Sequence, residues 1–206
     1  MPASKKLLNW ISEIQSIAQC GLAFTKDPFD EERFQRLREL AAELAAECSD
    51  LSLAEINHIF SLEKGYATPK VDMRAFALKG NKLLLVKERS DGLWTLPGGW
   101  ADVNESPSEA IRRETKEESG FDVEVIRIIA FWDKLKHDHP PEWPHAYKCF
   151  FHCNILAGKP EQNLEISEID FFAIDKLPPL SLPRVTKPEL LKLYENVQNN
   201  GGTLFD

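Results

Sequence analysis

The chain has 206 residues, of which 43% are hydrophobic and 28% charged, and its formal net charge is −8. This length suits one large domain or a main domain with a smaller appendage, and no apolar run is long enough to span a bilayer, which excludes a membrane protein. The acidic charge and the lack of a basic stripe argue against duplex nucleic acid as a partner, because phosphate neutralisation dominates such binding.

The first residues, MPASKKLLNWISEIQSIAQC, have no continuous apolar stretch after the lysines and do not read as a secretory signal. We therefore expect a cytoplasmic protein. Four cysteines in a chain of this length read as free thiols rather than as a disulfide framework. Cys149 and Cys153 share one face of an expected strand, which favours buried packing over metal binding.

Residues 1–65 are expected to form a small all-α region. Apolar residues near a 3.6-residue period predict a first helix: Leu7, Leu8, Ile11, Ile14, Ile17 and Ala18. The longest predicted helix has Asp27 as N-cap and Pro28 at its first position, and one apolar stripe: Phe34, Leu37, Leu40, Ala41 and Leu44.

A third, shorter helix is expected from Ser52, which forms a capping-box pattern with Glu55, up to Gly65. Three short amphipathic helices bury little apolar surface by themselves. We therefore expect this region to pack on the rest of the chain or on a second copy.

Residues 66–206 predict a mixed α and β domain. Two strands joined at Lys79-Gly80-Asn81 form a hairpin, and a glycine-rich turn at 96–99 and a helix follow. The segments VEVIRIIAFW, HAYKCFFHCNIL and ISEIDFFAI predict further strands. A capping box from Thr186 to Glu189 opens a last helix, and residues 199–206 are expected to fray.

The helix after the glycine turn is specified at both ends, by Ser106 as N-cap, Pro107, Glu109 as the capping-box acid and Gly120 as the stop. It carries three glutamates at i, i+3 and i+4 on one arc: Glu114, Glu117 and Glu118. Like charges so placed repel, and the helix dipole disfavours them in this C-terminal half. A hard divalent cation is the natural compensation.

Two more residues belong to this constellation. Glu105 lies just ahead of the helix, and Arg113 is placed to hold Glu105 or Glu117 by a charge-assisted hydrogen bond.

The whole segment resembles the Nudix box: Gly99, five residues, Glu105, seven residues, Arg113-Glu114, two residues, Glu117-Glu118, one residue, Gly120. One departure is Thr115, where an aliphatic residue is usual. The resemblance implies an α+β Nudix fold, with a mixed β-sheet between α-helices and a small N-terminal all-α region.

The resemblance also implies the chemistry. Mg²⁺ or Mn²⁺ would be held by the Gly99 carbonyl and by Glu114, Glu117 and Glu118, while Glu105 and Arg113 brace the loop. Water would attack one phosphorus of a pyrophosphate and release a nucleoside monophosphate and a phosphorylated group. The general base is either a box glutamate or an acid from a later loop, for which Glu165 and Glu168 are candidates.

The N-terminal region together with the segment PPLSLPR is similar to a Nudix subgroup that hydrolyses CDP-choline or ADP-ribose. In that subgroup the N-terminal helices contribute to a homodimer. CDP-choline is placed slightly ahead, because an aromatic face suits a quaternary ammonium. The aromatic residues expected around the cleft are Trp94, Trp100, Phe131 and Trp132.

Three residues are candidates for substrate contacts, each with an alternative. Arg74 could bind a substrate phosphate or form an edge-strand salt bridge, and Trp94 and Trp100 could stack on substrate or pack the turn. The loop with His137, His139 and His145 is expected at the rim of the cleft. Rival functions are RNA 5′-pyrophosphate removal, exonuclease-like trimming and a non-catalytic nucleotide-binding module.

Overall fold

The computed structural model describes residues 5–140 and 142–206. Its contacts divide the chain into two units, Met1–Pro69 and Lys70–Asp206. The boundary expected from the sequence, between residues 65 and 66, is four residues before this division. Within the described residues, every helix is too short or too polar to cross a membrane.

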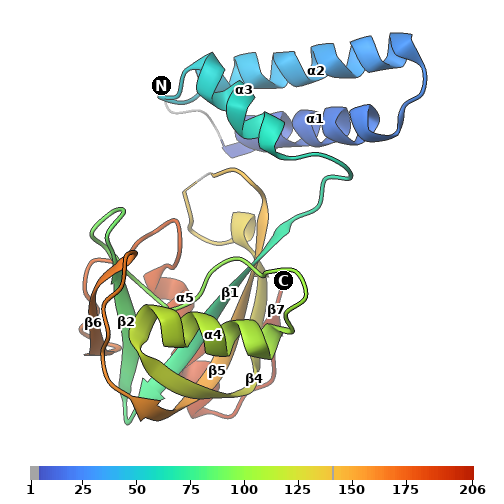
Figure 1. Cartoon of the computed structure of the whole chain (residues 1–206). Helices are drawn as coiled ribbons and strands as arrows, with labels where there is room; N and C mark the ends of the chain where they lie inside the picture. Colours follow the sequence, from blue (N-terminus) through green and yellow to red (C-terminus); the bar gives the residue numbers. More distant parts are fainter. Residues whose placement is uncertain (1–4, 141) are drawn as a thin grey trace. The chain divides into compact units, whose positions relative to one another are not determined.

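The first unit consists of three helices: α1 (Lys5–Phe24), α2 (Pro28–Glu47) and α3 (Leu53–Leu62) (Figure 1). The Asp27 carboxylate caps α2 by accepting from the backbone N–H groups of Phe29 and Asp30 at 2.8 and 3.1 Å. Ser52 and Glu55 form the predicted reciprocal capping box. The three expected helices are therefore present, and the start signals of the second and third are used.

The predicted apolar stripe of α1 is wrong in part. Ile17 is 52% exposed, whereas Gln15 and Gln19 are buried. Ile11 and Ala18 are buried as predicted. Both amide atoms of Gln15 lack a hydrogen-bond partner among the described residues. Periodicity counts apolar residues, but packing decides which side of the helix is covered, and here the covered side includes two glutamines.

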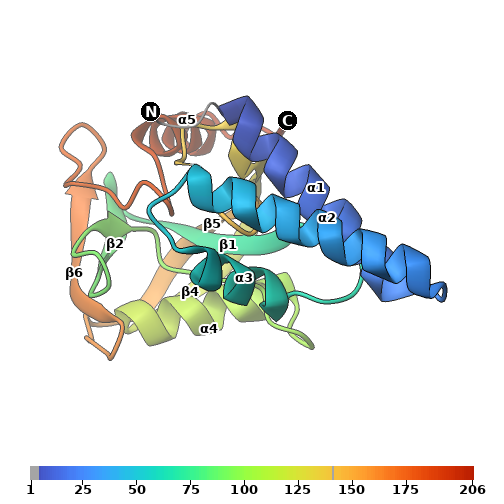
Figure 2. The same cartoon turned by 90° about the horizontal axis from the view of Figure 1, so that it is seen from above.

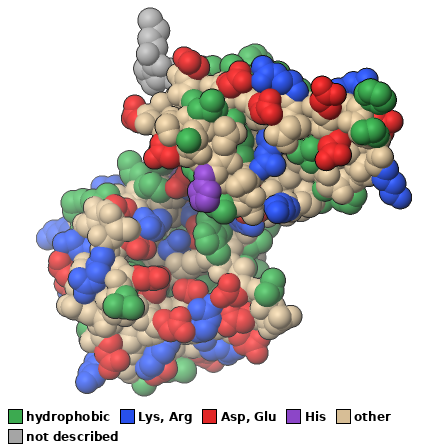
Figure 3. Space-filling view, turned by 45° about the horizontal axis from the view of Figure 1, so that its top comes forward, with side chains coloured by type: hydrophobic (Ala, Val, Ile, Leu, Met, Phe, Trp, Pro, Cys, Tyr) green, Lys and Arg blue, Asp and Glu red, His purple; other side chains and the backbone are tan. Residues whose placement is uncertain are grey.

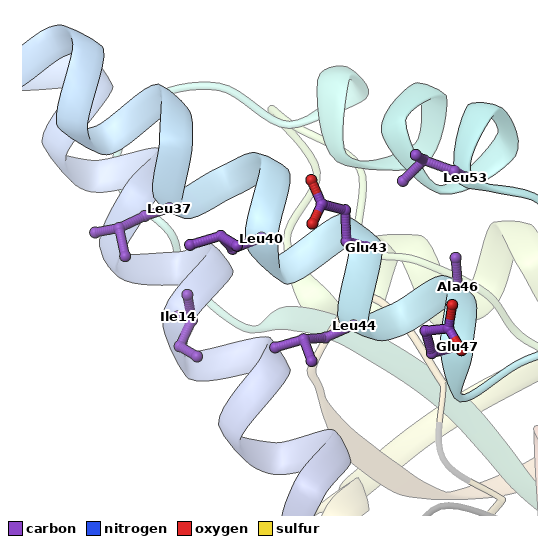
Figure 4. Close-up of a pocket in the computed structure, with 8 residues that line it drawn as sticks. All are labelled: Ile14, Leu37, Leu40, Glu43, Leu44, Ala46, Glu47 and Leu53. Atoms are coloured by element: carbon purple, nitrogen blue, oxygen red, sulfur yellow. The ribbon is translucent and has the colours of Figure 1, made fainter.

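Apolar side chains from all three helices line a groove of about 520 Å³ in this unit (Figure 4). Ile14 comes from α1 and Leu53 from α3, and α2 supplies the others: Leu37, Leu40, Glu43, Leu44, Ala46 and Glu47. Leu40 and Leu44 remain 37% and 40% exposed. The stripe predicted on α2 is thus only partly covered within one chain.

The second unit is built on a mixed sheet in the order β3-β2-β1-β5-β4-β7, with β6 paired to β2. The strands are β1 (Lys70–Lys79), β2 (Lys82–Glu88), β3 (Trp94–Thr95), β4 (Phe121–Asp133), β5 (Ala146–Gly158), β6 (Ile166–Ala173) and β7 (Leu204–Phe205). β1 runs parallel to β5 and β4 parallel to β7, and the other pairs are antiparallel. The expected hairpin joins β1 and β2.

Two helices cover the opposite faces of this sheet, α4 (Pro107–Ser119) and α5 (Lys187–Gln198) (Figure 2). On the α4 side, Ala110 and Ile111 pack with Ala75, Leu84 and Phe151. The α5 side has its own core: Leu190, Leu193, Phe76, Leu85, Trp94, Ile129 and Phe150. The predicted α+β class, with a sheet between helices, is confirmed.

The expectation that residues 199–206 fray is wrong. Leu204 and Phe205 pair with Ala130 and Phe131 at the edge of β4. The carboxylate of Asp206 accepts from the backbone N–H of Asp133 at 2.6 Å. A chain end has no local propensity signal for this pairing, which depends on the free edge that β4 offers.

Candidate active site

Helix α4 is held at both ends by the predicted signals. Ser106 accepts from the backbone N–H of Glu109 at 3.4 Å, and the Glu109 carboxylate accepts from the Ser106 backbone N–H at 2.9 Å. Gly120 ends the helix in the left-handed conformation, with φ of 77°. Local caps thus fix which glutamates of α4 face the sheet.

The glycine-rich turn lies along β1. The backbone N–H of Met73 donates to the Gly99 carbonyl and that of Ala75 to the Pro97 carbonyl, both at 2.8 Å. Gly98 has φ of +131°, and a Cβ there would lie 2.1 Å from the Met73 carbonyl oxygen. Only glycine fits this close approach of the turn to β1.

Arg113 gathers four acidic side chains around one guanidinium. It donates to both oxygens of Glu105 at 2.8 Å, and to Glu114 and Glu117 at 3.0 Å. A longer bond of 3.2 Å reaches Asp102. The hydrogen bond from Arg113 lowers the pKa of Glu105. Figure 3 shows acidic and basic side chains gathered over the face that carries α4.

Glu118 is buried against the glycine turn, and its Oε2 accepts from the Gly98 backbone N–H at 2.8 Å. Burial raises the pKa of Glu118 to about 8, although Arg74 and the Gly98 N–H favour the charged form. Burial also raises the pKa of Glu114. The Glu114 carboxylate lies beside Gly99, where a Cβ would be 3.5 and 3.6 Å from its two oxygens. The site therefore holds two carboxylates with too little compensating positive charge.

These donors suit a hard divalent cation, because all of them are oxygens and two are desolvated carboxylates. Glu117 differs from Glu114 and Glu118, because its side chain is 57% exposed and pairs with Arg113. Across residues 5–140 and 142–206, no three acidic, histidine or cysteine side chains stand close enough to hold a metal ion. Glu114 and Glu118 are the two more buried carboxylates. For Glu117 to bind the same cation, its side chain would have to leave Arg113.

Arg74 does not lie on an edge strand. It projects from β1, in the interior of the sheet, and its Nε donates to Asp72 Oδ1 at 2.7 Å while Nη1 donates to the Leu96 carbonyl at 3.2 Å. Lys148 of β5 binds the other oxygen of the same carboxylate. The sequence analysis overlooked Asp72 and Lys148, whose alignment arises only from the parallel pairing of β1 with β5.

The aromatic residues predicted around the cleft separate into two groups. Trp94 is 8% exposed and packs edge-on against Phe172, at 4.7 Å between ring centroids, and Trp132 is 4% exposed. Both belong to the core on the α5 side of the sheet. Trp100 and Phe131 are 50% and 40% exposed. Trp94 therefore has a packing role. Only two of the four rings, Trp100 and Phe131, are exposed enough to stack on a choline ammonium.

Each histidine of the β4–β5 loop faces a carboxylate. His137 lies 3.3 Å from Asp206, His139 2.9 Å from Glu189, and His145 2.9 Å from Asp133. The His139–Glu189 pair is almost fully buried, with both side chains 1% exposed. These contacts tie the loop to β4, to α5 and to the end of the chain.

Both candidates for a general base are exposed, but only Glu165 lies in the loop before β6, whereas Glu168 lies on β6 itself. Glu168 pairs with Lys87 at 2.6 Å. The loop of Glu165 approaches the end of α4, because Asn163 donates to the Glu117 carbonyl at 2.7 Å. Proximity to the box therefore favours Glu165 over Glu168.

Two family models match the chain. Residues 5–60 match the UDP-X-like, N-terminal oligomerisation domain, and residues 68–195 match the NUDIX domain. A protein of Bacillus subtilis (strain 168), named "Putative ADP-ribose pyrophosphatase YjhB", is 42% identical over 202 residues, which is 98% of this chain and 97% of the relative.

Solved structures agree with these matches. The crystal structure of a UDP-X diphosphatase has a TM-score of 0.65 and 36% identity and covers 98% of each chain. An ADP-ribose pyrophosphatase from Streptococcus suis 89-1591 has a TM-score of 0.62 and 41% identity, over 68% of this chain and 100% of its own. Since the NUDIX match alone spans more than half of the sequence, this chain belongs to the Nudix hydrolases.

Proposed function

We propose that this protein hydrolyses the pyrophosphate bond of a nucleoside diphosphate joined to a second group, giving a nucleoside monophosphate and the phosphorylated second group. The observation that carries the proposal is the placement of Glu114 and Glu118, both partly or fully buried, against Gly98 and Gly99. Such a desolvated carboxylate pair weakens the fold unless it serves a charged ligand.

Mg²⁺ or Mn²⁺ would be held by Glu114, Glu117, Glu118 and the carbonyl of Gly99. When bound, the cation neutralises the diphosphate and lowers the pKa of water. The residues of the chain supply the geometry: Arg113 fixes Glu105 and the start of α4 through a bidentate pair. Arg74 is proposed to donate to a phosphoryl oxygen, and Trp100, half exposed beside the turn, to stack on the substrate.

For the second group, ADP-ribose now ranks ahead of CDP-choline. The relative at 42% identity is named "Putative ADP-ribose pyrophosphatase YjhB", and the solved structure at 41% identity is that of an ADP-ribose pyrophosphatase. The sequence argument for choline needed a cluster of exposed aromatic rings, and two of the four are buried. Trp100 and Phe131 still offer faces to a choline ammonium or a nucleobase.

The N-terminal unit is proposed to form a homodimer, in line with its match to an oligomerisation domain. We retain residues 1–65 as the dimerisation region and 66–206 as the hydrolase domain. All four cysteines are free thiols, which suits a reducing compartment, and we propose a cytoplasmic location.

The test is a panel of substrates incubated with the full chain and Mg²⁺, Mn²⁺ or excess chelator. The panel holds ADP-ribose, CDP-choline, a UDP-sugar, NADH, diadenosine polyphosphates, 8-oxo-dGTP and 5′-triphosphate RNA. We expect ADP-ribose to yield AMP and ribose 5-phosphate with cation only. Full turnover in chelator, or release from RNA alone, would contradict the proposal, and a ten-fold preference for CDP-choline would restore the earlier ranking.

A further inference from the structure

Three charged side chains lie buried side by side on the α5 face of the sheet. Asp72 and Arg74 of β1 are 7% and 8% exposed, and Lys148 of β5 is fully buried. The parallel register places Asp72 directly beside Lys148. Burying a lysine costs free energy that an apolar residue would not, so its presence in this core, where Glu189 also lies buried, calls for a role.

The contacts show what this cluster fixes. Asp72 gives one oxygen to Lys148 and the other to Arg74 Nε. Arg74 Nη1 is held by the Leu96 carbonyl, immediately before the Pro97-Gly98-Gly99 turn. The guanidinium is thus anchored at two points, and among the described residues no acceptor is paired with Nη2.

The guanidinium of Arg74 lies near the site, because the Leu96 carbonyl that holds Nη1 is two residues before Gly98, whose backbone N–H donates to Glu118. Arg74 interacts electrostatically with Glu118, which lines the turn, and with Glu88 at the end of β2. A guanidinium that is fixed through Nε and Nη1 presents Nη2 in one direction only. This arrangement suits the recognition of a phosphoryl oxygen beside the box glutamates.

We propose that Lys148 is a positioning residue for Arg74. Lys148 occupies one oxygen of Asp72, so Arg74 contacts Asp72 through Nε alone. The Nη1 group of Arg74 then stays on the Leu96 carbonyl. Without Lys148, both oxygens of Asp72 turn to the guanidinium and draw it away from the turn. The inference rests on the proposed function, in which Nη2 of Arg74 contacts a substrate phosphate.

The experiment is a double-mutant cycle measured by kcat and KM with ADP-ribose as the probe and Mg²⁺ as the cation. We expect Arg74→Ala to lower kcat/KM by about 10²-fold and Lys148→Met by about 10-fold or more. The double variant should be no worse than Arg74→Ala alone, because Lys148 acts through Arg74. A purely structural role for Lys148 would instead give losses that multiply.

Arg127→Met is the matched control. Arg127 also faces α5, where it donates to Asn196 at 2.9 Å, but it contacts neither Asp72 nor Arg74 in the described residues. Its kcat/KM should stay within about three-fold of wild type. Melting temperatures of all variants separate folding from activity.

If Lys148→Met does not fold, Asp72→Asn/Lys148→Met removes one charge of each sign, and the amide oxygen at position 72 can still accept from Arg74 Nε. This variant should also lose about 10-fold in kcat/KM, with no further loss from Arg74→Ala. The inference would be overturned if either Lys148 variant had the kcat/KM of wild type, or if the losses of the single variants multiplied in the double variant. The proposed function would still stand as long as the wild-type chain hydrolyses ADP-ribose. Inactivity of the wild-type chain toward the whole panel would instead overturn the proposed function.

Discussion

Glu118 combines burial with an unfavourable charge, so activity and stability should separate when that charge is removed. Glu118→Gln keeps the shape of the side chain and relieves the desolvation of a buried carboxylate. We expect kcat for ADP-ribose to fall by at least about 10²-fold, while the melting temperature stays equal or rises. Steady-state kinetics and thermal unfolding measure the two effects. A variant within a few-fold of wild type would mean that Glu118 is not a ligand.

Glu189 gives the fold a dependence on pH. Burial opposes its ionisation, but the hydrogen bond and charge of His139, the charge of Lys148 and the Thr186 backbone N–H together lower the pKa of Glu189 below the ordinary 4.5. A carboxyl group whose pKa is lowered in the folded state contributes its full stabilisation of the fold at pH values above its pKa in the unfolded chain. This contribution is lost as pH falls through its pKa in the folded state.

Glu189→Gln should therefore cost about 2 kcal/mol of unfolding free energy at pH 6. The difference from wild type should shrink as pH falls below 4.5, as the native carboxylate takes up a proton. Urea unfolding at pH 6 and pH 3.5 measures it, with Glu195→Gln, an exposed acid of the same helix, as the control. An equal difference at both pH values would contradict the assignment.

At the scale of elements, helix starts were predictable because their signals are local. The capping boxes at Ser52, Ser106 and Thr186 all form as the sequence indicates. The buried side of α1 and the last strand were not predictable, because both depend on partners distant in sequence. The same reason explains the site: Arg113 and its acids lie within one segment, whereas Asp72 and Lys148 meet only across paired strands.

Strand β7 should stabilise the sheet edge to which it pairs. Deleting residues 203–206 removes the pairing with β4, the Thr203 bond to the Ile128 carbonyl at 3.0 Å and the Asp206 contacts. We expect a loss of about 2 kcal/mol in unfolding free energy and more self-association, because the edge of β4 becomes free. Asp206→Asn keeps the strand and should lose less. Unchanged urea unfolding in the deletion would show that β7 contributes nothing.

For the whole molecule, the sequence predicts a change from helices to strands after residue 65, and the contacts divide the chain after Pro69. The sequence left open which surface a second copy would cover. The groove with Leu37 and Leu44 is one apolar surface that the helices of the N-terminal unit leave partly open, besides exposed side chains such as Phe24 and Phe29.

We expect light scattering at micromolar concentration to give about twice the 23.5 kDa of one chain. Leu37→Glu or Leu44→Glu places a charge in the groove and should shift the mass toward the monomer. Leu191→Glu is the control, since Leu191 is similarly exposed, at 44%, but lies on α5 of the other unit. A wild-type mass near that of one chain would rule out the homodimer, and dimeric groove variants would rule out this surface.

The parallel pairing of β1 with β5 also affects how the protein is made. Asp72 and Lys148 are 76 residues apart in the chain, so β1 leaves the ribosome well before its partner exists. At typical synthesis rates this delay is roughly 4 to 15 s. β2 pairs with β1 only at Leu78 and Lys79, so it cannot shield the rest of the strand. During synthesis, the apolar residues of β1 therefore wait for β5, whereas the helices of the N-terminal unit make contacts that are closer in sequence.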